Sequence, residues 1–181
     1  NATVLIGLST VPGAFTRPII EKMASKVERP IIFPLSNPTS RSEAIPADLM
    51  KWTQGKALVA SGSPFEAVFW QGWRKPIAQC NNVYIFPAIG LALVACKARR
   101  VTDTMLIAAA EALGRLSPAI TDSSAPLLPE LRHAREVAVE IALAVALQAI
   151  EDGVAPSATE EELLDAVLAN QWYPDYYRLP L

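Results

Sequence analysis

The sequence is poor in the residues that build disulfide frameworks, metal sites and basic surfaces. Its 181 residues include two cysteines, Cys80 and Cys96, without Cys-x-x-Cys spacing, and one histidine, His133. This scarcity argues against a disulfide or zinc role and favours two reduced thiols, as in a cytoplasmic protein. The formal net charge is −2 and no stretch concentrates lysine and arginine. We therefore expect no nucleic acid partner.

Long hydrophobic runs are also missing. The longest apolar stretches, residues 85–96 and 137–150, are too short or too interrupted by charge to span a bilayer, so we expect no membrane partner. No signal peptide is recognisable. Because residues 4–7 have the pattern of a core strand already in progress, we expect further sequence upstream.

Three signatures of self-contained catalysis are absent as well. The sequence has no Gly-x-Gly-x-x-Gly fingerprint, no cluster with metal-ligand spacing and no nucleophile–base pair. His133 lies among charged residues, where a solvated role is expected. The chain by itself therefore offers no candidate catalytic residue and no candidate metal ligand.

The pattern that is present predicts an α/β fold. Short apolar runs at residues 4–7, 30–35 and 57–60 predict strands buried on both faces, and residues 16–26 and 46–52 predict helices between them. This alternation is typical of βαβ units in a parallel sheet. An irregular excursion or a hairpin follows at residues 65–75. Further helices are expected over residues 85–96, 102–115, 128–151 and 159–169.

Small polar residues follow each predicted strand. They are Gly7-Leu8-Ser9, Ser36-Asn37-Pro38 and Ser61-Gly62-Ser63-Pro64. The carboxyl ends of parallel strands form the ligand-binding edge of open α/β sheets. These residue types are also the usual ones in turns, so the pattern leaves both interpretations open.

Two asparagine positions carry the most specific binding signal. Asn37 has an amide that can bind a carboxylate, a hydroxyl or a carboxamide, or can form an Asx turn before Pro38. Asn81 and Asn82 precede the helix predicted at residue 85. There they either cap that helix or help to hold an anionic substrate.

Four motifs in order resemble the malic enzyme family. They are Leu5-Ile6-Gly7-Leu8-Ser9 with Gly13-Ala14-Phe15-Thr16, Glu28-Arg29-Pro30-Ile31-Ile32 leading to Leu35-Ser36-Asn37-Pro38-Thr39, Ser61-Gly62-Ser63-Pro64-Phe65, and Asn81-Asn82-Val83-Tyr84-Ile85-Phe86-Pro87. They cover about the first half of the chain. Cys80 and Ala88 stand where the family usually has glycine, and Gln79-Cys80-Asn81-Asn82 is most similar to bacterial NAD-linked members.

The resemblance implies an oxidoreductase that converts (S)-malate to pyruvate and CO₂ while reducing NAD, with Mg²⁺ or Mn²⁺. It implies that Asn37 contacts both malate and the cofactor and that Asn81, supported by Asn82, contacts malate. Gly7 and Leu8 would line the cofactor's path. The family's acid, base, metal ligands and phosphate-binding loop would lie upstream, so the 181 residues alone are expected to be inactive.

The expected organisation is one partial Rossmann-like NAD-binding domain over residues 1–181. Residues 1–98 would form the parallel sheet with its crossover helices, and residues 99–181 a helical carboxy-terminal half. We expect a cytoplasmic homo-oligomer, with the aromatic tail Trp172–Tyr177 in a subunit contact. The alternative is a non-catalytic nucleotide-binding or regulatory module of the same fold. The residues do not decide between NAD and NADP.

Overall fold

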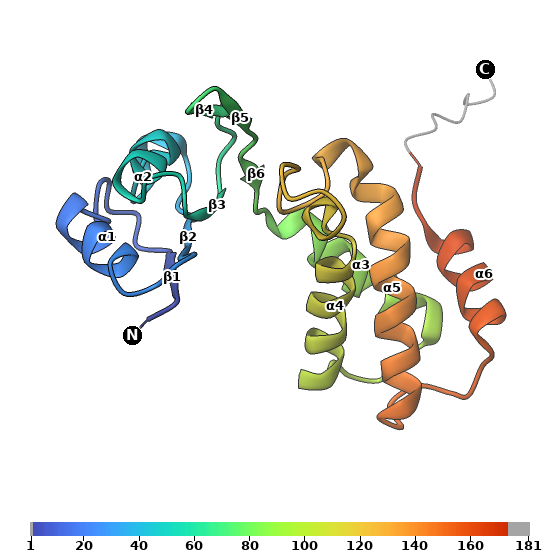
Figure 1. The fold of residues 1–181 in the computed structure, drawn as a ribbon. Coiled ribbons are helices and arrows are strands. Elements are labelled where there is room, and N and C mark those ends of the chain that lie inside the picture. The colour runs from blue at the N-terminus through green and yellow to red at the C-terminus, as the bar shows by residue number, and fades with distance from the viewer. Residues whose placement is uncertain (1, 174–181) are drawn as a thin grey trace, which may run out of the picture. The chain divides into compact units, whose positions relative to one another are not determined.

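The structure, a computed structural model, describes residues 2–173 (Figure 1). Their packing forms two compact units. Of the described residues, the first unit contains residues 2–82 and 114–134, and the second contains residues 83–113 and 135–173. The first unit holds the strands and the second holds most of the helices, so each is described separately.

The first unit is built on a parallel sheet. Its strands are β1 (Val4–Gly7), β2 (Ile31–Pro34), β3 (Leu58–Ser61) and β6 (Ala78–Gln79), in the order β1-β2-β3-β6, and every neighbouring pair is parallel. The predicted α/β class with a parallel sheet is therefore confirmed. The two-residue strand β6 was not predicted, because two residues carry no periodic pattern.

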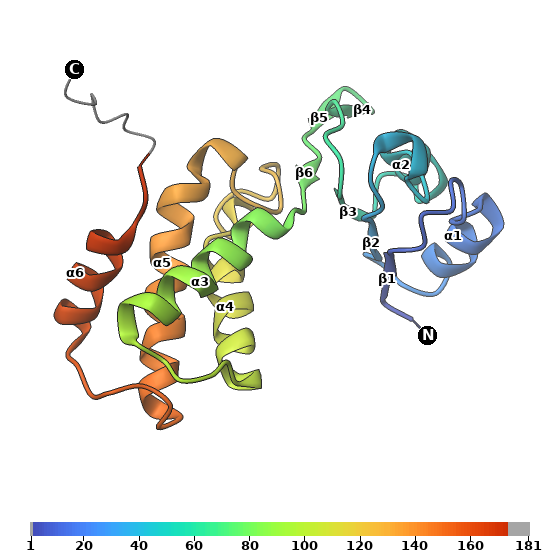
Figure 2. The ribbon, with the colours of Figure 1, turned by 180° about the vertical axis from the view of Figure 1, so that it is seen from behind.

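Two helices connect the first three strands. They are α1 (Arg17–Ala24) and α2 (Pro46–Trp52), and both lie on the same side of the strands in the two opposite views (Figures 1 and 2). This placement follows from right-handed crossovers, because the strand order advances in one direction from β1 to β3. The core between helices and sheet contains Phe15, Ile20, Ile32, Ala44, Leu49, Met50, Ala57 and Val59.

Strand β1 departs from the expectation of burial on both faces. Val4 is 45% exposed and Ile6 is 54% exposed, whereas Ile32 in the central strand β2 is fully buried. Val4 and Ile6 alternate with Leu5, which packs against the core below the helices, so one face of β1 is covered and the other is exposed. An apolar run thus predicted the strand correctly but not its burial.

A hairpin fills the segment after β3. Strands β4 (Val68–Trp70) and β5 (Trp73–Lys75) pair antiparallel around Gln71 and Gly72, both of which have positive φ. Such a two-residue turn matches the twist of the paired strands. Of the two alternatives for residues 65–75, the hairpin is the one found.

The second unit consists of α3 (Phe86–Cys96), most of α4 (Asp103–Arg115), α5 (Ala134–Glu151) and α6 (Glu160–Asn170). Helices α4 and α5 run side by side in both views (Figures 1 and 2). Many of its buried side chains are alanines, and helices α3 and α6 lie close together. These alanines include Ala88, Ala92, Ala109, Ala138, Ala142, Ala146 and Ala149.

The ends of these helices follow local sequence signals, with one correction. Thr159 and Glu162 form the predicted capping box of α6, and Gly153 adopts a φ of 67° after α5. Helix α5 was expected to begin at residue 128 but begins at Ala134, after a 3-10 turn over Leu131–His133. Pro129 does not account for the later start, because proline is accepted in the first turn of a helix, as at the starts of α1, α2 and α3.

The aromatic tail is described only in its first part. Trp172 is 75% exposed, and the Arg135 guanidinium lies 5.2 Å from the centre of the Tyr173 ring. The remainder of the predicted contact segment, residues 174–177, lies outside the described residues. Among the helices of residues 2–173, none combines the length and the apolar character needed to cross a bilayer.

Candidate functional site

The predicted site residues follow strands that end at one edge of the sheet. Because β1, β2, β3 and β6 are all parallel, their carboxyl ends share that edge. Gly7 ends β1, Asn37 comes three residues after β2, and Asn81 comes two residues after β6. The sheet therefore brings these positions to the same side of the first unit, where open α/β sheets bind ligands.

The ends of β2 and β3 approach each other unusually closely at Gly62. A Cβ atom at this position would lie 2.0 Å from the carbonyl oxygen of Leu35. The Gly62 backbone N–H donates to the carbonyl of Pro34 at 3.2 Å. Only glycine allows this approach, so the glycine of the Ser61-Gly62-Ser63 motif has a structural reason.

Asn37 is joined to the end of the neighbouring strand rather than to its own turn alone. Its Oδ1 accepts a hydrogen bond from the Ser63 hydroxyl at 2.5 Å, and its Nδ2 donates weakly to the carbonyl of Leu35 at 3.4 Å. Ser63 is buried, whereas Asn37 is exposed. The amide is thus held by its oxygen, and the second hydrogen of Nδ2 on this exposed side chain remains available as a donor.

Asn81 and Asn82 follow the short strand β6. This strand is held against β3 by the Cys80 N–H, which donates to Ser61 at 2.8 Å, and by Gln79 Nε2, which donates to the Gly62 carbonyl at 3.3 Å. Asn81 is half-buried and Asn82 is exposed at the start of a 3-10 turn. Helix α3 begins after Ile85, so Ile85 and neither of the asparagines stands at its N-cap position.

Gly7 and Leu8 differ sharply in exposure. Gly7 is buried, and a Cβ atom there would lie 2.5 Å from Cδ of Glu43 and 2.7 Å from Cζ of Phe15. The space above its Cα is therefore filled by this protein's own side chains. Leu8 is 76% exposed at the strand end, so it presents apolar surface at the same edge.

The buried carboxylate of Glu43 was not singled out from the sequence. The side chain is fully buried and accepts hydrogen bonds from the backbone and the hydroxyl of both Ser9 and Ser36. Burial alone raises the pKa of Glu43, but these hydrogen bonds outweigh it and lower the pKa to about 2. Glu43 lies after the Leu35–Thr39 motif, and no periodicity or spacing in the sequence indicates that its side chain is buried or functional.

The described part of the chain offers neither a reactive thiolate at Cys80 nor a cluster of metal ligands. Burial raises the pKa of the free Cys80 thiol, which keeps it protonated near neutral pH. Across residues 2–173 no three histidine, cysteine, aspartate or glutamate side chains gather as metal ligands. The described residues therefore do not fit a metal ion.

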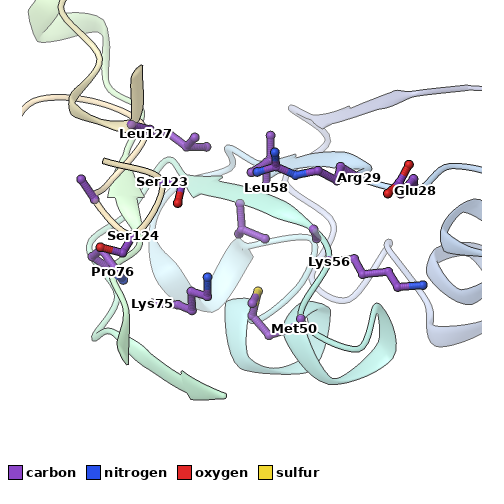
Figure 3. Close-up of a pocket in the computed structure, with 15 residues that line it drawn as sticks. Glu28, Arg29, Met50, Lys56, Leu58, Lys75, Pro76, Ser123, Ser124 and Leu127 are labelled. Carbon is purple, nitrogen blue, oxygen red and sulfur yellow. The ribbon is translucent and has the colours of Figure 1, made fainter. Parts of the chain in front are cut away.

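A separate cavity of about 570 Å³ lies away from the predicted residues (Figure 3). Arg29 and Lys56, which precede β2 and β3, line it, so it adjoins the amino ends of these strands. The close-up shows Met50 and Leu58 in its wall, with Lys75 and Ser123 nearby (Figure 3). No residue predicted to bind malate or NAD lines this cavity.

Comparison with models of protein families shows which family the chain belongs to. The family model described as "Malic enzyme, NAD binding domain" matches residues 1–150. The chain belongs to this family. The resemblance seen in the four sequence motifs is thereby confirmed.

Individual relatives support the same family assignment. The chain is 55% identical over 176 residues to the NAD-dependent malic enzyme of Edwardsiella ictaluri and 52% identical to that of Vibrio parahaemolyticus, covering 97% of this chain in each case. It spans 31% of the length of these relatives.

Solved malic enzyme structures have the same fold. The Entamoeba histolytica malic enzyme matches 93% of this chain with a TM-score of 0.75 and 29% identity. The malic enzyme of Pyrococcus horikoshii matches 94% with a TM-score of 0.70 and 26% identity. The chain covers 32% and 35% of these two proteins, respectively. The malic enzyme likeness therefore extends through the helical unit, beyond the sequence motifs.

Proposed function

We propose that this chain is the carboxy-terminal part of a longer NAD-linked malic enzyme. The whole protein would oxidise (S)-malate, pass the hydride to NAD and release CO₂ and pyruvate. The observation that carries the proposal is the exposed amide of Asn37, oriented by Ser63 at the carboxyl edge of a parallel sheet. The names of the relatives, which are NAD-dependent malic enzymes, support NAD as the cofactor.

The chemistry of Asn37 suits both ligands. Because its oxygen is engaged by Ser63, the second hydrogen of Nδ2 can donate to a carboxylate oxygen of malate or to the carboxamide oxygen of nicotinamide. Bound NAD supplies the hydride acceptor, whereas the amide contributes only binding and orientation.

Asn81 would donate to a malate carboxylate, with Asn82 in support. Gly7 and Leu8 would border the cofactor at the end of β1. The exposed side chain of Leu8 offers apolar contact, and buried Gly7 allows Glu43 to pack beneath the strand end. These five positions are this chain's share of the proposed site.

The remaining chemistry would come from outside this chain. The proposed acid, base and Mg²⁺ or Mn²⁺ ligands would belong to upstream sequence, as the resemblance to malic enzymes implies. The assembled enzyme would be a cytoplasmic homo-oligomer. The chain alone would neither bind the metal nor turn over malate.

The direct test is an assay of the full-length protein with malate, NAD and Mn²⁺. We expect NADH formation that requires both malate and the metal, with pyruvate as product, and no turnover by the 181-residue chain alone. Cofactor binding by the full-length protein without malate turnover would instead favour the non-catalytic nucleotide-binding module.

Substitution of Asn37 tests the residue that carries the proposal. Asn37→Ala in the full-length enzyme should lower kcat/KM for malate about ten- to a hundredfold, because a hydrogen bond to a charged group is lost. Asn170→Ala is the matched control, since Asn170 is an exposed amide bonded only locally to Ala166. Equal kinetics for the two variants would contradict the role of Asn37.

A further inference from the structure

Glu43 connects the loops that follow two neighbouring strands. Its Oε1 accepts from the Ser9 backbone N–H at 2.8 Å, the Ser9 hydroxyl at 2.9 Å and the Ser36 hydroxyl at 2.5 Å. Its Oε2 accepts from the Ser36 backbone N–H at 3.3 Å. Ser9 comes two residues after β1 ends and Ser36 two residues after β2 ends. One carboxylate therefore joins both strand ends.

The backbone around Glu43 adds contacts to the same loop. The carbonyl of Glu43 accepts from the Phe15 N–H at 3.0 Å, and that of Ser42 accepts from the Gly13 N–H at 3.2 Å. The Ser36 hydroxyl, which donates to Glu43, also accepts from the Thr10 N–H at 2.8 Å. The segment that follows β1, from Ser9 to Phe15, is thus held by several hydrogen bonds.

A role in packing alone does not explain a carboxylate at this position. Glu43 is fully buried, and a charge without partners in such a place is strongly unfavourable. An apolar side chain would fill the same volume but would leave the converging N–H and O–H donors unsatisfied. The buried negative charge of Glu43 is therefore stabilised only when the donors of both loops stay in place.

We propose that Glu43 is a positioning residue for the ligand-binding edge, holding Leu8 and Asn37 in register by fixing their sequence neighbours Ser9 and Ser36. This inference rests on the proposed malic enzyme function. Because Glu43 is fully buried, we expect it to contact neither malate nor cofactor, and its pKa of about 2 means that it carries no proton to transfer near neutral pH. It acts through geometry, not through acid–base chemistry.

The test compares three variants of the full-length enzyme. Glu43→Gln replaces one oxygen by a donor that faces the Ser9 and Ser36 donors. Ser36→Ala removes one arm of the network and keeps the carboxylate. Glu66→Gln, at an exposed position, is the matched control for the loss of one charge.

The expected result is a change in KM that a loss of folded protein cannot produce. In the folded fraction of Glu43→Gln, the KM values for NAD and malate should each rise at least about fivefold, and Ser36→Ala should shift them in the same direction by a smaller factor. The control should keep wild-type values. A purely structural role would reduce the amount of active enzyme but leave both KM values unchanged.

The outcomes separate this inference from the proposed function. An active wild type whose Ser36→Ala and soluble Glu43→Gln variants keep wild-type KM values overturns the positioning role alone. If Glu43→Gln does not fold, wild-type KM values in Ser36→Ala are sufficient to overturn it. A wild type without malate-dependent NADH formation overturns the proposed function and this inference together.

Discussion

The hydroxyl of Ser63 donates to the side-chain oxygen of Asn37 at 2.5 Å and thereby joins the ends of β3 and β2. The two residues are 26 positions apart in the sequence. The serine is buried and the asparagine exposed, so a fixed part of the sheet orients a group that faces solvent. In the proposed enzyme, that orientation decides which atom of the amide meets the ligand.

Removing the Ser63 hydroxyl should weaken ligand binding without removing the ligand contact itself. Ser63→Ala in the full-length enzyme should raise the KM for malate about three- to tenfold, since the freed amide must be ordered by the ligand. Steady-state kinetics measure this change. Ser25→Ala is the control, because the Ser25 hydroxyl makes only a local bond to Lys22. The idea fails if both variants have the wild-type KM.

A side chain at Gly62 should force the ends of β2 and β3 apart. Gly62→Ala places a Cβ atom against the Leu35 carbonyl oxygen, and such overpacking should cost about 1–3 kcal/mol of unfolding free energy. Gly90→Ala is the matched control, since its added Cβ in α3 would have no atom within 4 Å apart from its chain neighbours and the backbone of its own helix. The control should stabilise by about 0.5–1 kcal/mol. Thermal unfolding of both variants measures the difference. Equal shifts in unfolding temperature would contradict the close approach of Gly62 to the Leu35 carbonyl.

Glu43 should make stability depend on pH in the acid range. Its folded pKa of about 2 lies below the ordinary value of 4.5, so its stabilising contribution is complete above pH 4.5 and is lost as the pH falls towards 2. The difference in pKa corresponds to at most about 3 kcal/mol. Urea unfolding of wild type and Glu43→Gln should show a stability difference that shrinks across this window. A stability difference that stays constant from pH 4.5 to pH 2 would contradict the lowered pKa of Glu43 in the folded protein.

The aromatic tail should contribute to assembly of the full-length protein. Truncation after Asn170 removes Trp172, which is 75% exposed, and Tyr173, whose ring lies beside Arg135. We expect a smaller oligomer and a lower unfolding temperature, measured by light scattering and thermal unfolding. Trp73→Ala controls for loss of an exposed tryptophan, since Trp73 is 72% exposed on β5. Unchanged mass and stability after truncation would refute the subunit contact.

Much of the fold was predictable because its signals are local. The apolar runs predicted β1, β2 and β3, and Thr159 with Glu162 predicted the start of α6. Strand β6 was missed because it exists only through pairing with β3. The exposure of Val4 and Ile6 in β1 was missed because an apolar run does not reveal whether both faces of a strand are covered.

The candidate site was predictable only in part, for a related reason. Asn37 and Asn81 were singled out because they stand in motifs that are continuous in the sequence. The Ser63 hydroxyl that orients Asn37 and the Glu43 carboxylate that binds Ser9 belong to contacts between distant segments. No property of residue 43 within its own segment distinguishes it from an ordinary surface glutamate.

The sequence by itself determined the parallel α/β class, the positions of the main helices and the family, because periodicity, capping and motifs are all properties of short segments. Only the tertiary structure decided which strand lies at the edge, that Gly62 must be glycine and that Glu43 is buried. Each of these depends on the approach of segments far apart in the chain, where the folded backbone sets burial and hydrogen bonding.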